Sequence, residues 1–169
     1  MKYQIKEGDK IQIIGSSKHG KDTLAEILRD TFGLTFSSSS YMALNIFLYD
    51  ILKKKYGYKT KEECFNDRHS SDEMANEWYE HICEYNKKDK SRLTKEILKS
   101  NDMYVGIRDF EEFKYCRSLY NIIIYVDANE RIKEKDLTMK IPKEEADIII
   151  DNNGTLNEFK EKIKNIFYK

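Results

Sequence analysis

Residues 10–23 read KIQIIGSSKHGKDT, and their pattern of apolar side chains changes at Gly15. Before that glycine, a short run rich in isoleucine predicts a β-strand over residues 10–14. After Gly20, apolar residues recur at helical spacing, which predicts a helix that ends at Gly33. The loop between them has the pattern G-x-x-x-x-G-K, in which backbone N–H groups surround phosphate oxygens and the lysine reaches the outer phosphates. The segment therefore predicts a phosphate-binding loop between a strand and a helix.

Four further strands are predicted along the chain, and helices separate them. Short β-rich or apolar runs place these strands at residues 34–37, 103–107, 122–126 and 147–150. Amphipathic spacing or capping residues predict helices after residue 40, after Ser70, over about 90–99, after Asp109 and after Thr155. This alternation predicts the α/β class with a doubly wound, five-stranded parallel sheet, whose ligands bind at the carboxyl ends of the strands.

Length, charge and cysteine content narrow the class of protein. A chain of 169 residues is long enough for one domain with its own core. The 30 basic and 30 acidic residues balance, so a nucleic acid is an unlikely main partner. No apolar run approaches the length that spans a bilayer, and the three cysteines form neither a zinc pattern nor a disulfide framework. These features predict a cytoplasmic protein without membrane association.

Four stretches carry a resemblance to a known family. They are GKDT at 20–23, DRHSSDEM at 67–74, YVGIR at 104–108 and ADIIIDNNG at 146–154. Together they resemble the deoxynucleoside monophosphate kinases of large phages, which belong to the P-loop nucleoside monophosphate kinase superfamily. The resemblance implies that ATP is the phosphate donor and Mg²⁺ the cofactor. It also implies one kinase domain over residues 1–169, a helical acceptor-binding insertion at about 41–100, a short lid at about 129–143, and a homodimer.

The ATP site is predicted at the phosphate-binding loop and at one later turn. Its loop residues are Gly15, Ser16, Ser17, Lys18, His19, Gly20, Lys21, Asp22 and Thr23. Lys21 is the predicted catalytic residue of this group, because it reaches the outer phosphates. Asp22 stands where a serine or threonine hydroxyl usually contacts magnesium, so we expect it to act on the metal through water. The resemblance implies that the turn at Asn152 and Asn153 borders the adenine.

Two arginines are predicted to bind the phosphate of the acceptor. Only 6 of the 30 basic residues are arginine, and a guanidinium can grip a phosphate with two parallel hydrogen bonds. Arg68 lies in a polar loop, and Arg108, also a predicted catalytic residue, ends a predicted strand on the ligand side of the sheet. The alternative is that each only pairs with a nearby carboxylate, Arg68 with Asp67 or Asp72 and Arg108 with Asp109 or Asp127.

Other predicted acceptor residues follow the ends of strands or the polar loop. They are Ser38, Ser39, His69 and Asp127, although the serine hydroxyls would serve equally well as helix caps. Arg131 is predicted on a short lid helix, where it would stabilise charge on the transferring phosphoryl group. Its alternative role is that of a solvated helix residue in a run of basic side chains.

The sequence favours one function and leaves two alternatives open. The first is the ATP-dependent phosphorylation of a deoxynucleoside monophosphate to the diphosphate. A P-loop kinase that acts on a hydroxymethylated base in DNA would need a basic groove, which the zero net charge does not favour. A nucleotide-binding module without turnover is the least favoured, because Lys21 and the two arginines of the acceptor side are present.

Overall fold

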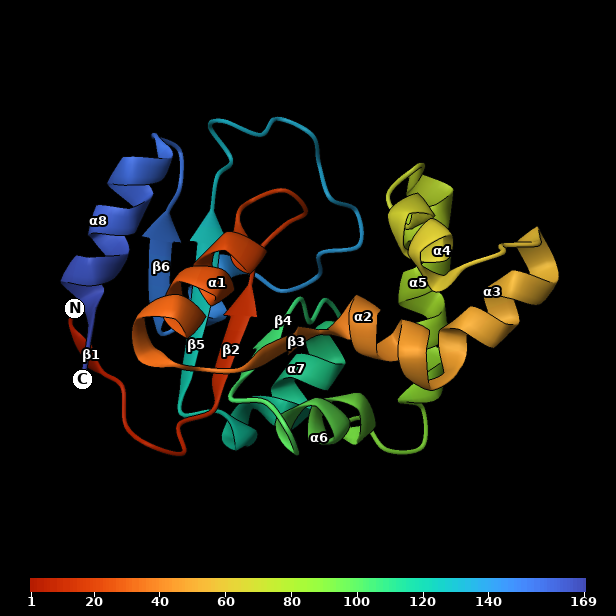
Figure 1. Cartoon of the computed structure of the whole chain (residues 1–169), viewed down its shortest axis with the longest axis horizontal. Helices are drawn as coiled ribbons and strands as arrows, with labels where there is room; N and C mark the ends of the chain where they lie inside the picture. Colours follow the sequence, from red (N-terminus) through yellow and green to blue (C-terminus); the bar gives the residue numbers. More distant parts are fainter.

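The computed structural model describes residues 1–169 and is built around a five-stranded parallel sheet (Figure 1). Its strands are β2 (Ile11–Ile14), β3 (Phe36–Ser38), β4 (Met103–Val105), β5 (Ile122–Asp127) and β6 (Ile148–Asp151). They lie in the order β3-β4-β2-β5-β6, and Ile11 of the central strand pairs with Met103 on one side and Ile122 on the other. The predicted α/β class with a five-stranded parallel sheet is confirmed.

Helices cover both faces of this sheet (Figure 1). One face packs against α1 (Lys21–Phe32) and α8 (Leu156–Ile166), and the other against α6 (Arg92–Leu98) and α7 (Phe110–Cys116). Along β5, Ile122 and Ile124 belong to the first core and Ile123 and Tyr125 to the second. A strand buried on both faces reads as a continuous apolar run, which is why β5 lacks polar alternation. Short strands β1 (Tyr3–Gln4) and β7 (Phe167–Tyr168) pair and bring the two termini together.

The segment between β3 and α6 forms a helical lobe at the side of the sheet (Figure 1). It contains α2 (Ser39–Ala43), a π-helical turn (Leu44–Leu48), α3 (Tyr49–Tyr56), α4 (Lys61–Asp67) and α5 (Asp72–Tyr85). Buried side chains such as Leu48, Leu52, Met74 and Trp78 give the lobe its own core. The sequence interpretation did not include α4, although Thr60 caps it by accepting a hydrogen bond from the amide of Glu63.

The connection between β5 and β6 differs from the predicted lid helix. Residues 128–142 contain no helix, and only a short 3-10 turn, Lys143–Glu145, precedes β6; another, Arg117–Leu119, follows α7. The prediction of a helix at Arg131 is wrong because the segment has no apolar stripe to bury: Leu137, its one leucine, is 61% exposed. The loop is instead held by the burial of Ile141 in the core and by polar contacts, such as the amide of Lys140 donating to the carbonyl of Arg108 at 3.0 Å.

No helix of the structure is both long enough and apolar enough to span a bilayer.

Candidate active site

The phosphate-binding loop, residues 15–20, connects β2 to α1 and depends on its two glycines. Gly15 has φ +145°, and a Cβ there would lie 2.5 Å from the carbonyl oxygen of Val126. Gly20 has φ +99°, and its Cβ would lie 2.4 Å from Nδ2 of Asn152. Another residue at either position would strain the backbone and collide with its neighbour. The motif therefore allows β5 and the turn after β6 to pack closely against the loop.

Two side chains support the loop from within the fold. His19 is fully buried, its Nδ1 accepts a hydrogen bond from the amide of Ala128 at 3.1 Å, and burial lowers its pKa. The side-chain amide of Asn152, also buried, donates to the carbonyl of His19 at 2.9 Å. Both side chains were predicted to bind the nucleotide. In the structure they fix the loop to the ends of β5 and β6, and a direct contact with the nucleotide stays a prediction.

The turn after β6 also holds Arg131. Nε of Arg131 donates to the carbonyl of Asn152 at 3.2 Å, while Oδ1 of Asn153 accepts from the amides of Glu130 and Arg131. Arg131 thus lies beside the turn predicted to border adenine, and it does not line the cavity that contains Lys21, Arg68 and Arg108. Its predicted role on the transferring phosphoryl group remains untested.

A cavity of about 330 Å³ opens between the phosphate-binding loop and the helical lobe. This volume is at the lower end of the range for small-molecule sites. The cavity brings together residues that the sequence assigned separately to the donor and to the acceptor. Its lining includes Ser17, Lys18, Lys21, Asp22, Ser38, Ser39, Arg68, His69 and Arg108, together with Ser40, Phe65, Val105 and Gly106.

Lys21 and Asp22 begin α1 at the wall of this cavity. Lys21 is buried, and its Nζ donates to the carbonyl of Ser16 at 2.8 Å. Burial, reinforced by the positive charge of Arg108, lowers the pKa of Lys21 to about 7. A bound phosphate would raise this pKa again, because a nearby anion favours the charged ammonium. Asp22 is exposed and is the one acidic side chain among the residues that line the cavity.

Arg68 forms no ion pair with either carboxylate considered in the sequence analysis. Its Nη1 donates to the carbonyl of Phe65 at 2.8 Å, and its guanidinium carbon lies 3.7 Å from the centroid of the Phe65 ring. Asp67 instead accepts a hydrogen bond from Tyr58. The guanidinium is therefore oriented by an aromatic ring and a carbonyl, and its remaining donors are available to an anion in the cavity.

Arg108 does form an ion pair, but with a residue that the sequence analysis did not identify. Its Nη1 contacts Oδ2 of Asp136 and donates to Oγ1 of Thr138 at 2.9 Å. The predicted alternative partners are engaged elsewhere. Asp109 caps α7 and accepts from the hydroxyl of Tyr79 at 2.8 Å, and Asp127 pairs with Lys143 at 2.8 Å.

Asp136 lies in the loop between β5 and β6 and reaches the phosphate-binding loop. The amide of Ser17 donates to Oδ2 of Asp136 at 2.8 Å, and the side chain of Asp136 is only 9% exposed. Although burial opposes it, the adjacent Arg108, Thr138 and Ser17 lower the pKa of Asp136. No periodicity or capping pattern in the sequence marks Asp136, so only the folded chain reveals this contact.

The other predicted acceptor residues have mixed positions. Ser38 caps α2 by accepting from the amide of Tyr41, which confirms the alternative role given to a serine hydroxyl, and Oγ of Ser39 donates to the carbonyl of Gly106 at 2.9 Å. His69 is at the rim of the cavity, where partial burial and the charges of Arg68 and Arg108 lower its pKa, so it is neutral at physiological pH. Asp127, held by Lys143, is not among the lining residues, and its acceptor role stays a prediction.

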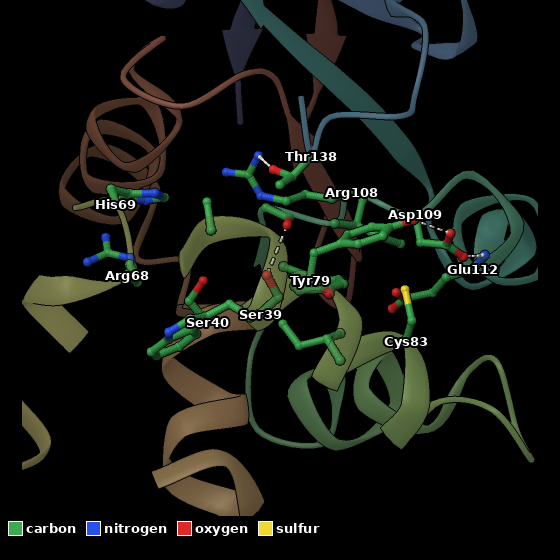
Figure 2. Close-up of a pocket in the computed structure, with 16 residues that line it drawn as sticks. Ser39, Ser40, Arg68, His69, Tyr79, Cys83, Arg108, Asp109, Glu112 and Thr138 are labelled. Atoms are coloured by element: carbon green, nitrogen blue, oxygen red, sulfur yellow. Dashed lines mark hydrogen bonds between the residues drawn. The ribbon is translucent and has the colours of Figure 1, made fainter. Parts of the chain in front are cut away.

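A second, deeper pocket continues from the cavity past Ser39, Ser40, Arg68 and Arg108 (Figure 2). Figure 2 shows Arg68 and His69 on one side, Arg108 and Thr138 on another, and Asp109 and Glu112 at the far end. Most of the deeper lining is aromatic or aliphatic, with Trp78, Tyr79, Ile82, Tyr104 and Ile107. No pattern in the sequence distinguishes these residues from ordinary core residues. The enclosed space is about 30 Å³, close to that of one water molecule.

Glu112 is a buried carboxyl group in this deeper pocket. It is 2% exposed, and its nearest hydrogen-bond partner is Oγ1 of Thr94 at 3.4 Å. Burial, together with the negative charge of Asp109, raises the pKa of Glu112 to about 8. At neutral pH the group is mainly protonated, so it presents one hydrogen-bond donor and one acceptor rather than a charge.

Comparison with solved structures supports the fold assignment. A shikimate kinase from Aquifex aeolicus is similar with a TM-score of 0.50 and 13% identity, over 92% of this chain and 94% of that one. A gluconokinase from Sinorhizobium meliloti gives 0.48 and 15% identity, over 94% of this chain and 91% of that one. A sugar kinase from Janibacter sp. gives 0.48 and 13% identity, over 93% and 92%. No family model and no curated protein matches the sequence.

The chain shares its fold with this shikimate kinase. At these identities the likeness concerns the fold alone, and it does not extend to the acceptor.

Proposed function

We propose that this protein is an ATP-dependent kinase that phosphorylates a nucleoside monophosphate, with deoxynucleotides as the expected substrates. The observation that supports it most is that Lys21, Arg68 and Arg108 line one cavity. Phosphoryl transfer between two phosphates needs mainly positioning and positive charge. These three cations, with Lys18 as a fourth basic residue of the lining, meet that need for a donor and an acceptor that both carry phosphate.

The two ends of the cavity suggest a division of roles. The loop amides and Lys21 would hold the phosphates of ATP, since they surround the amino terminus of α1. Arg68 would hold the acceptor phosphate, because its guanidinium faces the cavity without a competing carboxylate. Asp22 fits a magnesium ion held through water, because Mg²⁺ prefers oxygen ligands and keeps much of its hydration shell. When bound, the metal would neutralise charge between the phosphates.

The deeper pocket is the proposed place of the nucleobase. Trp78, Tyr79 and Ile107 offer flat apolar surfaces, and Glu112 offers a hydrogen-bond donor and an acceptor. A planar heterocycle with polar edge atoms matches this combination. Since the enclosed space is about 30 Å³, the base would enter only if side chains of α5 and α7 move apart.

A hydroxyl acceptor is the second candidate. A hydroxyl must lose a proton during transfer, which calls for a base close to the acceptor. Asp22 is an exposed carboxylate on the cavity wall. The shikimate kinase, the gluconokinase and the sugar kinase of the comparison are named for acceptors that carry hydroxyls. A hydroxymethylated base in DNA belongs to the same chemical class.

One acceptor screen separates these candidates. Purified protein with ATP and Mg²⁺ is incubated with the common and modified nucleoside monophosphates in ribose and deoxyribose form. Shikimate, gluconate and duplex DNA containing hydroxymethylated bases are tested in parallel. We expect ADP formation and a nucleoside diphosphate product, both absent with Lys21→Ala. Phosphorylation of a hydroxyl acceptor alone would replace the first candidate by the second, and ATP binding without any product would identify a nucleotide-binding module.

A further inference from the structure

The carboxylate of Asp136 lies where the phosphate-binding loop and Arg108 converge. Oδ2 accepts a hydrogen bond from the amide of Ser17 at 2.8 Å and also contacts Nη1 of Arg108. Oδ1 accepts from the hydroxyl of Thr138 at 2.6 Å and from its amide at 3.1 Å. One carboxylate oxygen is thus shared between an amide of the phosphate-binding loop and a guanidinium.

These are the contacts that a phosphate oxygen would make at this position. Loop amides of a G-x-x-x-x-G-K motif bind phosphate oxygens, and guanidinium groups do so as charge-assisted donors. The lysine of the motif reaches the outer phosphates. Nζ of Lys21 lies against the carbonyl of Ser16, the residue next to Ser17, and the charge of Asp136 acts on Lys21. Asp136 therefore marks the outer end of the donor site.

We propose that the carboxylate of Asp136 occupies the position of an oxygen of the transferred phosphate of ATP, and that this phosphate displaces it on binding. The phosphate then takes over the amide of Ser17 and the guanidinium of Arg108. Arg108 thereby becomes a catalytic residue for the transferred phosphoryl group, in addition to its predicted contact with the acceptor. The proposal rests on the function proposed above.

The tip of the loop that carries Asp136, residues 133–137, can move away without disrupting the core, because its other side chains are exposed. Met139 and Ile141, further along, pack in the core and stay in place. Apart from Asp136, the contact of this tip with the phosphate-binding loop is the ion pair between Glu134 and Lys18 at 3.4 Å, whose side chains are 74% and 65% exposed. Leu137, beside Asp136, is exposed and packs against no core cluster. Two anions cannot share one amide and one guanidinium without strong repulsion, so the bound phosphate favours the displaced loop.

The seated carboxylate lowers the apparent affinity for ATP in the free protein. The apparent dissociation constant equals the intrinsic one divided by the fraction of molecules that are competent to bind. If Asp136 occupies the phosphate position in about 90% of molecules, about 10% are competent, and binding is about tenfold weaker. Asp136→Asn removes the competing charge while retaining the shape of the side chain. We expect this variant to bind ATP about tenfold more tightly. ADP lacks the outer phosphate, so its affinity should increase much less in this variant.

The test is isothermal titration of ATP and of ADP, each with Mg²⁺ and without acceptor, into wild type, Asp136→Asn and Asp136→Ala. Glu130→Gln is the matched control, because it removes the same charge from an exposed side chain in the same loop. Thermal denaturation of each variant verifies that it is folded, and Asp136→Ala serves if the asparagine variant is not. Tighter ATP binding in the Asp136 variants but not in Glu130→Gln supports the proposal.

Two results would overturn it. Weaker ATP binding would mean that the carboxylate assists the nucleotide or a metal, and unchanged binding would mean that it does not compete with ATP. An equal increase in affinity for ATP and for ADP would mean that the carboxylate of Asp136 competes with an inner phosphate instead of the outer one. These titrations need no turnover, so they remain informative if the acceptor screen yields no product. A failure of the proposed function is therefore distinguished from a failure of this proposal.

Discussion

The side-chain amide of Asn152 donates a hydrogen bond to the carbonyl oxygen of His19 at 2.9 Å. This contact connects the turn after β6 to the phosphate-binding loop, and both residues are buried. It also explains the need for glycine at position 20, where a Cβ would collide with the same amide nitrogen. A residue that the sequence associated with adenine is therefore a support of the phosphate-binding loop.

Asn152→Ala tests this support. Loss of a buried hydrogen bond is expected to lower the free energy of unfolding by about 1–2 kcal/mol, measured by denaturant titration. Binding of ATP and GTP should weaken by the same factor, because the loop amides that hold the phosphates lose their position. A loss confined to ATP would indicate a direct contact with adenine. Asn153→Ala is the control, since its Oδ1 accepts from Glu130 and Arg131 and not from the loop.

Binding of ATP should take up a proton at Lys21. The pKa of this residue is about 7 in the free protein, so at about pH 8 most molecules carry a neutral amine. The phosphates of ATP favour the ammonium form, and a proton enters from the buffer. Titration calorimetry in two buffers that differ in ionisation enthalpy should show this uptake at about pH 8 and little at about pH 6. It should be absent in Lys21→Ala, whereas uptake in that variant would assign the proton to another group.

Arg68→Lys should weaken the binding of the acceptor and leave the binding of ATP unaffected. Lysine retains the charge but loses the planar fork and the stacking on Phe65. A lost hydrogen bond to a charged group costs about 1.5–3 kcal/mol, which is roughly one to two decades in the KM of the monophosphate. Saturation curves for both substrates measure the effect. Arg92→Lys is the matched control, because the guanidinium of Arg92 also stacks on an aromatic ring, that of Tyr85, but lies outside the cavity. An equal increase in the KM of ATP would indicate that Arg68 contacts both substrates.

Asp22→Asn should raise the concentration of Mg²⁺ required for half-maximal rate. A carboxylate beside phosphates repels them unless a cation lies between. Removal of the carboxylate charge therefore weakens the binding of Mg²⁺ and relieves the repulsion between Asp22 and the phosphates. Activity is measured against Mg²⁺ at fixed ATP, with the exposed Asp30→Asn at the other end of α1 as control. An unchanged magnesium dependence would leave Asp22 as a charge that interacts with the helix dipole.

Glu112 should make the protein less stable as the pH rises. Its pKa is about 8 in the folded chain against an ordinary value of 4.5, so the folded state retains a proton that the unfolded state has lost. Stability attributable to Glu112 therefore falls from about pH 4.5 up to about pH 8. In Glu112→Gln this part of the pH dependence should disappear, so the difference in unfolding free energy from wild type should shift in favour of the variant towards pH 8.

The matched control for Glu112 is Glu111→Gln, an exposed neighbour in the same helix. Other groups titrate in this range too, including His19 and His69 with lowered pKa values, whose contributions have the opposite sign. The comparison is therefore between each variant and wild type at every pH. A difference that is the same at all pH values would show that Glu112 does not retain its proton on folding.

Local sequence determined the phosphate-binding loop, the five strands and several helix ends. Residues 10–23 were sufficient to predict the strand, the loop and the helix, because the G-x-x-x-x-G-K pattern and its flanking apolar residues lie in one short segment. The caps at Asp109 and Thr155 were predicted correctly for the same reason, since the bonded amides are three residues away. Arg68 and Arg108 also stood out locally, as rare arginines near strand or loop ends.

Tertiary structure alone decided which groups meet at the site. Arg108 had two predicted carboxylate partners, but Asp109 is engaged by Tyr79 and Asp127 by Lys143, which leaves Asp136 to reach it. That residue comes from a loop without periodicity, so no pattern in the sequence specifies where its side chain lies. The buried position of Glu112 and the contact between Asn152 and His19 likewise depend on packing between distant segments. Such contacts depend on burial and on competition among neighbours, which exist only once the chain has folded.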